Sequence, residues 1–244
     1  MNSKKDVISK IQENKFNQNS INDIIIKLSK EPKLFHFEVV DFLLNNLKKE
    51  ELQKININLI YLLGELGNLT KLEQKYTQYL YESFYASDRW IRSEILKVLE
   101  KNIEIVKSDN NIILLISSAL KEEYETNNLI ALRILLKLDK FPDRIFKSFI
   151  SVLNKGKSEL KGTIGKILEK HFQEEALIFR LLNQNKNYRI LKSSGLRLIL
   201  QSLFPLMNRI ENFQKLIETS DWETEKKSIF LKEIKIIISL ANRI

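Results

Sequence analysis

The sequence predicts an all-α protein in which about six or seven helical hairpins pack one after another within a single domain, residues 1–244. Six glycines and three prolines in 244 residues are far fewer than the turns of a sheet protein require. Apolar residues recur along most of the chain with the period of about 3.6 residues that places them on one face of a helix. They make up 43% of the chain, which is enough for a continuous core between such helices.

The clearest hairpin is expected to consist of two helices, near residues 69–85 and 89–106. Two runs of apolar residues each follow one helical face there, namely Leu69, Leu72, Tyr76, Leu80 and Phe84, and then Ile91, Ile95, Val98, Leu99 and Ile103. Asp88 lies in the short turn between the runs and has the chemistry of an N-cap residue. Helices joined by so short a turn lie antiparallel, and further hairpins must pack on both sides to cover their apolar faces.

Two segments of this region resemble HEAT repeats. Residues 62–68 (LLGELGN) resemble the end of the second helix of a repeat, including its glycine-terminated exit. Residues 88–92 (DRWIR) resemble the turn and second-helix start of the next repeat, where the family favours an aspartate and then an arginine. The resemblance implies a right-handed α-α superhelix, a HEAT-like (armadillo-like) solenoid whose second helices line the concave face.

One helix is expected to be capped by Ser20 and ended by Pro32. The other helices are expected near residues 3–14, 33–48, 51–66, 109–122, 127–139, 142–154, 158–172, 174–184, 187–204, 207–219 and 221–242. First helices then begin near residues 33, 69, 109, 142, 174 and 207. Hairpins that repeat every 32 to 40 residues are typical of HEAT and armadillo arrays. Pro142 is expected at the first position of its helix, where proline is favoured.

Residues typical of enzymes and metal sites are scarce. The chain has no cysteine and only two histidines, His36 and His171, neither with a second ligand at metal-binding spacing. The Gly-Lys-Ser at residues 156–158 is not a phosphate-binding loop, because position 151 is serine where that loop needs glycine. Residues 1–15 lack the apolar h-region that a signal peptide is expected to have, and no apolar run reaches the roughly 18 residues that span a bilayer. We therefore expect a soluble, cytoplasmic, non-enzymatic protein with no cofactor, metal or membrane partner.

The net charge of +9 comes almost entirely from the second half of the chain. Residues 1–122 contain 18 lysines and arginines against 17 acidic residues, whereas residues 123–244 contain 22 against 14. When the second helices are aligned by their apolar faces, basic residues recur at two equivalent positions, which are occupied by Arg92, Lys161 and Lys192 and, about one turn earlier, by Arg89, Lys157 and Arg189. This basic ridge is expected either to bind a partner or to pair with acidic residues inside the array, as Asp88 could pair with Arg92.

The function that these features favour is an interaction scaffold that binds another protein, an acidic one where the basic ridge takes part. The alternative is a nucleic-acid-binding protein. Residues 87–92 (SDRWIR) resemble the Trp/Arg segments of alkyl-purine DNA glycosylases, which are built from HEAT-like repeats with a basic concave face. Those enzymes place several tryptophans and an aspartate around the lesion, whereas Trp90 and Trp222 are the only tryptophans here.

Aromatic residues of the hairpin between residues 69 and 106 are another candidate contact surface. Tyr79, Tyr81, Tyr85 and Trp90 lie outside the apolar stripe. They are expected either to form a patch that binds a peptide or to fill gaps between helices, which is the commoner role of such residues.

The last helix carries more apolar residues than one stripe holds, including Phe230, Ile234, Ile236 and Ile238. An array normally ends in a helix with a polar outer face. We therefore expect the C-terminal hairpin to dock on a second copy of the chain, as a homodimer, or on another protein. The alternative is that this helix buries the residues by tilting against the preceding hairpin.

Overall fold

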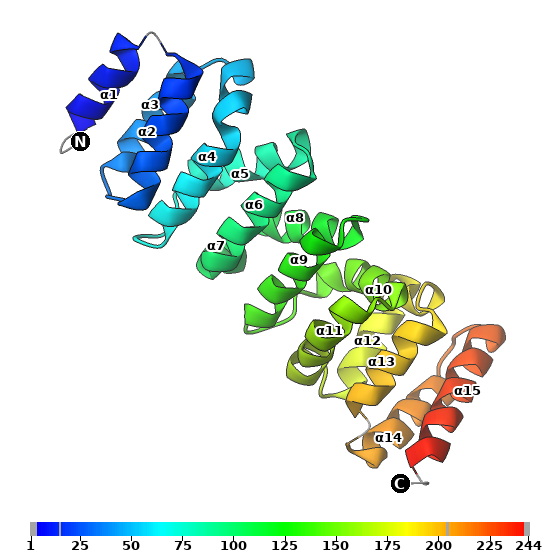
Figure 1. Ribbon diagram of the computed structural model, residues 1–244. Coiled ribbons are helices and arrows are strands. Elements are labelled where there is room, and N and C mark those ends of the chain that lie inside the picture. The colour runs from blue at the N-terminus through cyan, green and yellow to red at the C-terminus, as the bar shows by residue number, and fades with distance from the viewer. Residues whose placement is uncertain (1–3, 15, 204, 242–244) are drawn as a thin grey trace. The chain divides into compact units, whose positions relative to one another are not determined.

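The computed structural model describes residues 4–14, 16–203 and 205–241 (Figure 1). Over this part of the chain it contains fifteen α-helices, two 3-10 helices and no strand, so the all-α prediction is confirmed. None of the helices in these ranges combines the length and the apolar character needed to cross a membrane. The chain divides into two compact units, Met1–Leu115 (unit 1) and Ile116–Ile244 (unit 2).

Unit 1 is built from helical hairpins and one short additional helix. Its helices are α1 (Lys4–Glu13), α2 (Gln18–Lys30), α3 (His36–Asn46), α4 (Lys49–Gly67), α5 (Gln74–Ala86), α6 (Arg89–Lys101) and α7 (Ile103–Ser108). The next helix, α8 (Asn110–Lys121), contains the boundary between the units.

Unit 2 continues the alternation of first and second helices after α8. Its helices are α9 (Glu125–Lys137), η1 (Asp143–Ile145), α10 (Phe146–Lys155), α11 (Ser158–His171), α12 (Glu175–Asn183), η2 (Gln184–Arg189), α13 (Ser193–Leu203), α14 (Met207–Glu218) and α15 (Thr224–Ala241). The 3-10 helices η1 and η2 lie directly before α10 and directly after α12.

Within each unit, the second helices of successive hairpins pack side by side (Figure 1). In unit 1, α4 contacts both α2 and α6. In unit 2, α11 contacts α9 and α13, and α13 also contacts α15. The apolar faces of these helices are fully buried, as at Leu59 and Leu63 in α4 and Ile164 in α11. Burial of such faces is the main favourable contribution to the stability of each unit.

Side-chain hydrogen bonds also join residues that lie one hairpin apart. In unit 1, the amide of Asn58 donates to Asn22 Oδ1 over 2.7 Å, and the two residues are 36 positions apart. In unit 2, His171 Nε2 lies 3.2 Å from the Leu135 carbonyl oxygen, again at a separation of 36. Comparable bonds within the units span 31 to 39 positions. Successive hairpins within each unit are therefore joined by hydrogen bonds as well as by apolar packing.

Three local predictions concern helix starts. The N-cap at Asp88 is confirmed, because its Oδ1 accepts two backbone N–H groups of α6 at 2.9 and 3.1 Å. The predicted cap at Ser20 is wrong, because the side chain of Asn17 caps this helix and α2 begins at Gln18. The prediction for Pro142 is also wrong. Its ψ of 114° is extended, and it precedes the 3-10 helix η1.

The helix expected over residues 89–106 is interrupted at Asn102. The Asn102 side chain donates to the Val98 carbonyl oxygen at 2.9 Å, a local bond that competes with helix continuation. Its backbone, with φ −109° and ψ 58°, leaves the helical region, and α7 starts at the next residue. Gly67 makes room for this break, because a Cβ at position 67 would collide with the Asn102 carboxamide.

The first helix of the third hairpin starts later than expected. α5 begins at Gln74 rather than near residue 69. Leu69 still belongs to the turn that ends α4, where its N–H bonds to the Leu66 carbonyl oxygen. It is 47% exposed, so the prediction that Leu69 belongs to the apolar face of this helix is wrong.

The second helix of the sixth hairpin also starts later, at Ser193 rather than near residue 187. Asn185 and Lys186 have positive φ angles of 52° and 54°, which interrupt the helical path within η2. Arg189 therefore ends η2, and Lys192 directly precedes α13. The alignment that placed these two residues on the helix is corrected accordingly.

Replacing Gly162 and Gly165 with alanine is expected to raise the free energy of unfolding by up to about 1 kcal/mol per residue. Both glycines lie within α11, and an added Cβ would meet no neighbouring atom within 4 Å. Alanine costs less conformational entropy in a helix than glycine does. Unfolding in guanidinium chloride, followed by circular dichroism, measures the change.

Gly64→Ala is the matched control for this prediction. Gly64 is also helical, but its added Cβ would lie 2.8 Å from Val98 Cγ2, on a β-branched side chain that cannot swing away. This substitution is expected to destabilise the protein despite the same gain in helix propensity. A neutral result at both Gly162 and Gly165 would contradict the prediction.

Candidate functional site

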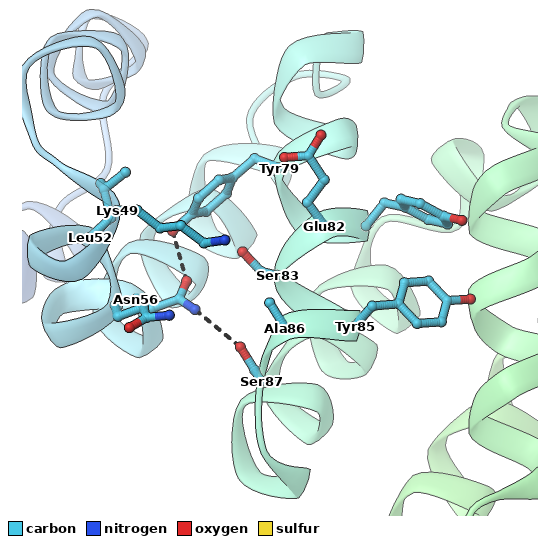
Figure 2. Close-up of a pocket in the computed structure, with 11 residues that line it drawn as sticks. Lys49, Leu52, Asn56, Tyr79, Glu82, Ser83, Tyr85, Ala86 and Ser87 are labelled. Carbon is cyan, nitrogen blue, oxygen red and sulfur yellow. Dashed lines mark hydrogen bonds between the residues drawn. The ribbon is translucent and has the colours of Figure 1, made fainter.

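A pocket of about 720 Å³ lies between the first turns of α4 and the last turns of α5, within unit 1 (Figure 2). It is lined by Lys49, Leu52, Gln53 and Asn56 of α4, by Tyr79, Tyr81, Glu82, Ser83, Tyr85 and Ala86 of α5, and by Ser87. Its volume falls within the range of about 300–1,000 Å³ that is usual for ligand pockets.

Asn56 joins the two sides of the pocket. The Tyr79 hydroxyl donates to Asn56 Oδ1 at 2.7 Å, and Asn56 Nδ2 donates to the Ser87 hydroxyl at 3.4 Å (Figure 2). Asn56 is 6% exposed, and a buried amide is costly unless it is hydrogen-bonded. These two bonds therefore hold the C-terminal end of α5 against α4.

Tyr79 acts as a hydrogen-bond donor. Burial raises the pKa of its hydroxyl to about 12, although a hydrogen bond with Ser83 lowers this pKa in part. The hydroxyl therefore keeps its proton at neutral pH and continues to donate to Asn56. Tyr79 therefore helps to fix the geometry of the pocket.

Lys49 and Glu82 are the two charged residues that line the pocket. The Glu82 carboxylate accepts a hydrogen bond from the Gln78 amide at 2.7 Å. Lys49 is exposed, and no residue in the described part of the chain pairs with its ammonium. The pocket thus presents the unpaired ammonium of Lys49 on the α4 side and the carboxylate of Glu82, whose partner is a neutral amide, on the α5 side.

Three residues of the predicted aromatic patch belong to this pocket. Tyr79, Tyr81 and Tyr85 all line it, and the rings of Tyr81 and Tyr85 meet edge to face with centroids 5.0 Å apart. Tyr85 is 47% exposed and points away from the Asn56 side in Figure 2. Tyr79 fills the gap between α4 and α5, which is the packing role expected of these residues, and the peptide-binding role stays a prediction.

The remaining predicted residues of unit 1 lie at the start of α6, outside the pocket. Trp90 is 58% exposed, and the Arg89 guanidinium carbon lies 5.2 Å from the centroid of its ring. Arg92 turns toward the protein, where its Nε donates to the Phe84 carbonyl oxygen at 3.0 Å. Trp90 and Arg89 are therefore the surface members of this group.

Two members of the predicted basic ridge form ion pairs within unit 2. Lys157 pairs with Glu125, and Arg189 pairs with Glu223. The hydrogen bond from Arg189 lowers the pKa of Glu223 to about 2. The first pair joins the start of α11 to the start of α9, and the second joins the end of η2 to the residue before α15, so these two cations take part in contacts between hairpins.

Lys161 and Lys192 differ from those two residues. Both side chains are exposed, and neither ammonium has a partner among the residues that the structure describes. The backbone of Lys192 is held in place, because its N–H donates to Asn154 Oδ1 at 2.8 Å. These lysines are the unpaired cations of the predicted ridge in unit 2.

The predicted C-terminal interface is only partly at the surface. Phe230 and Ile234 are 1% and 0% exposed, so the expectation that they lie on an outer face is wrong. The Phe230 ring packs edge to face against Trp222, with centroids 5.1 Å apart. Ile236 is exposed and Ile238 is half-buried. α15 therefore turns its aromatic face inward, against the rest of unit 2.

The two histidines are packed residues. His36 Nδ1 accepts the Lys33 backbone N–H at 3.1 Å, and burial lowers the pKa of this imidazole. Burial also lowers the pKa of His171, in spite of its hydrogen bond to the Leu135 carbonyl oxygen. In the described ranges, no group of three or more histidine or carboxylate side chains is placed to hold a metal ion.

The predicted site residues did not include the α4 side of the pocket. One signal for it was present, because Asn56 is a polar residue directly after Ile55, in a helix whose neighbouring inward positions are apolar. Comparisons with family models, with curated proteins and with solved structures find no match to this chain.

Proposed function

We propose that the chain is a HEAT-like helical solenoid that acts as a non-enzymatic scaffold and binds another protein. The observation that carries this proposal is the repeated lateral contact between hairpins, in which side-chain hydrogen bonds join residues 31 to 39 positions apart within each unit. Hairpins that bury their apolar faces on one another leave a long row of side chains in solvent. Such surfaces are the usual binding sites of helical arrays.

Exposed aromatic residues support a protein partner. Trp90 and Tyr85 are 58% and 47% exposed. Tryptophan and tyrosine are enriched in protein–protein interfaces, because they bury a large area at low cost in side-chain entropy. Arg89, which lies over the Trp90 ring, adds a residue type that is also common at such interfaces.

Charge pairing favours protein over nucleic acid as the partner. Binding to a phosphate backbone depends on lysines and arginines that are available to neutralise phosphates. Lys157 and Arg189 instead pair with carboxylates of the same chain. The glycosylase alternative also calls for several tryptophans at a surface, and Trp222 is 3% exposed.

The proposal is tested by reversing the charge of the two unpaired lysines of unit 2, Lys161 and Lys192. Lys161→Glu combined with Lys192→Glu is expected to weaken capture of the partner about tenfold, because two exposed charges then repel an acidic surface. Stability is expected to change by less than about 0.5 kcal/mol per residue, since neither side chain has a partner to lose. Affinity capture with the tagged full chain, followed by mass spectrometry and titration of the captured protein, measures the effect.

The matched control carries the same change in charge on first helices, at Lys147 in α10 and Lys215 in α14. Both lysines are exposed. Lys147→Glu combined with Lys215→Glu is expected to leave capture unchanged. Equal losses in the two double variants would contradict binding through the second helices. Release of the captured material by nuclease would favour the nucleic-acid alternative.

A further inference from the structure

We propose that the pocket between α4 and α5 receives a short segment of a partner protein in which an apolar side chain lies next to an acidic residue. This inference rests on the proposed scaffold function, and it names the ligand of one site within it. The size of the pocket, the residues of its walls and the ammonium of Lys49 support it.

The walls suit an apolar side chain. Leu52 lines the pocket from α4, and the Tyr79 ring and the Ala86 methyl group lie on the α5 side (Figure 2). Water in such a space makes poor contacts with its walls, so an apolar side chain that displaces it gains free energy in proportion to the area buried. A volume of about 720 Å³ exceeds what one side chain fills, so neighbouring residues of the same segment also enter.

The pocket is organised before the ligand binds. The hydrogen bonds of Asn56 to Tyr79 and Ser87 tie its two sides together. No buried side-chain nitrogen or oxygen in the described part of the chain lacks a hydrogen bond, so no polar group has to find a partner in the ligand. A pre-formed site spends little free energy on ordering, which favours binding of a short segment.

Charge determines which segment fits. Lys49 lines the pocket at the first residue of α4, where the positive end of the helix dipole also lies. Glu82, the other charged residue of the lining, is already hydrogen-bonded to Gln78. Because the neutral Gln78 amide leaves the negative charge of Glu82 in place, an acidic residue of the segment fits beside the Lys49 ammonium, on the α4 side of the pocket, and not beside Glu82.

The test uses short fluorescein-labelled peptides with a glycine–serine background and anisotropy titrations against the full chain. The central residue is tryptophan, leucine or alanine, and the residues beside it are glutamate, glutamine or lysine. Peptides with a tryptophan or leucine anchor and glutamate are expected to bind. Replacing the anchor with alanine is expected to weaken binding about tenfold or more.

Ala86→Trp is the blocking variant. Ala86 is exposed at the end of α5 and lines the pocket, so an indole there fills the space without entering the core. Its matched control is Ala176→Trp, at an exposed alanine in α12 of unit 2. Ala86→Trp is expected to abolish peptide binding, and Ala176→Trp to leave it intact.

Lys49→Glu tests the selection by charge. It is expected to weaken binding of the glutamate peptide about fivefold and to strengthen binding of the lysine peptide. Lys54→Glu is the control, because Lys54 is exposed on the same helix and does not line the pocket. A carboxylate in the first turn of a helix is favourable, so Lys49→Glu is not expected to unfold the protein.

Several results would overturn the proposal. They are the absence of binding by every peptide in the series, equal binding of alanine-anchored peptides, and binding that Ala86→Trp leaves unchanged. Equally tight binding of N-acetyl-tryptophanamide alone would make this a small-molecule pocket, and self-association lost in Ala86→Trp would make it a contact between copies. If peptides fail while capture still depends on Lys161 and Lys192, the pocket proposal falls and the scaffold function remains.

Discussion

Trp222→Ala is expected to lower the free energy of unfolding by about 3–5 kcal/mol. The indole is 3% exposed and lies in a stack of rings, with its centroid 4.4 Å from that of Tyr188 and 5.4 Å from that of Phe179. Phe230 of α15 meets it edge to face. Alanine would leave a cavity bordered by three rigid rings, which cannot close without moving the helices that carry them.

The second tryptophan provides the control. Trp90 is 58% exposed, so Trp90→Ala is expected to change stability by about 0.5 kcal/mol or less. Trp222→Phe keeps an aromatic ring in the stack but loses the indole N–H donor to Asn183, and its cost is expected to lie between the two alanine variants. Guanidinium unfolding followed by far-UV circular dichroism gives all three values. Similar losses at Trp222 and Trp90 would contradict the assignment of Trp222 to the core.

Features of the fold that depend on neighbouring residues could be predicted from the sequence. The apolar period identified the helices, and the aspartate before α6 identified its cap, because helices and caps are determined within a few residues. Asp88 accordingly accepts two N–H groups of α6. The all-α class follows from the same local information.

Features that depend on contacts between hairpins could not be predicted in this way. The break at Asn102 depends on Gly67 of the preceding hairpin, because only glycine leaves space there for the Asn102 carboxamide. The spacing of apolar residues in α15 likewise predicts a helix but does not show which of these residues face the core. Phe230 turns toward Trp222, a contact that no stripe on one helix reveals.

The candidate site shows the same limit. Local spacing predicted only pairs within one turn, such as Asp88 with Arg92. Lys157 pairs instead with Glu125, which lies 32 residues earlier and on another hairpin, so the sequence did not reveal this partner. The pocket likewise arises where the first turns of α4 meet the last turns of α5. The sequence predicted the three tyrosines of α5 but missed Asn56 of α4. The local sequence of each helix does not show which residues of another helix lie opposite it.

Asn128→Leu is expected to lower the free energy of unfolding by about 2–4 kcal/mol. Asn128 is fully buried, and its Nδ2 donates to the carbonyl oxygens of Ala119 at 2.7 Å and Glu122 at 3.1 Å, near the end of α8. Its Oδ1 accepts a hydrogen bond from the Lys155 ammonium at 2.7 Å. Leucine has a similar size but supplies neither donor nor acceptor. The loss therefore comes from polar groups left without partners and not from a cavity.

The position of Lys155 makes this loss large. Its ammonium reaches from the end of α10 to the Glu122 carbonyl oxygen as well as to Asn128, and burial lowers its pKa. A partly buried cation that loses one of its two acceptors must move toward water or lose its proton, and either change weakens the contact between hairpins. Asn111→Leu is the control, because Asn111 is exposed on α8. This variant is expected to change the free energy of unfolding by about 0.5 kcal/mol or less. Denaturant unfolding compares the two variants, and equal effects would show that Asn128 does not hold this network together.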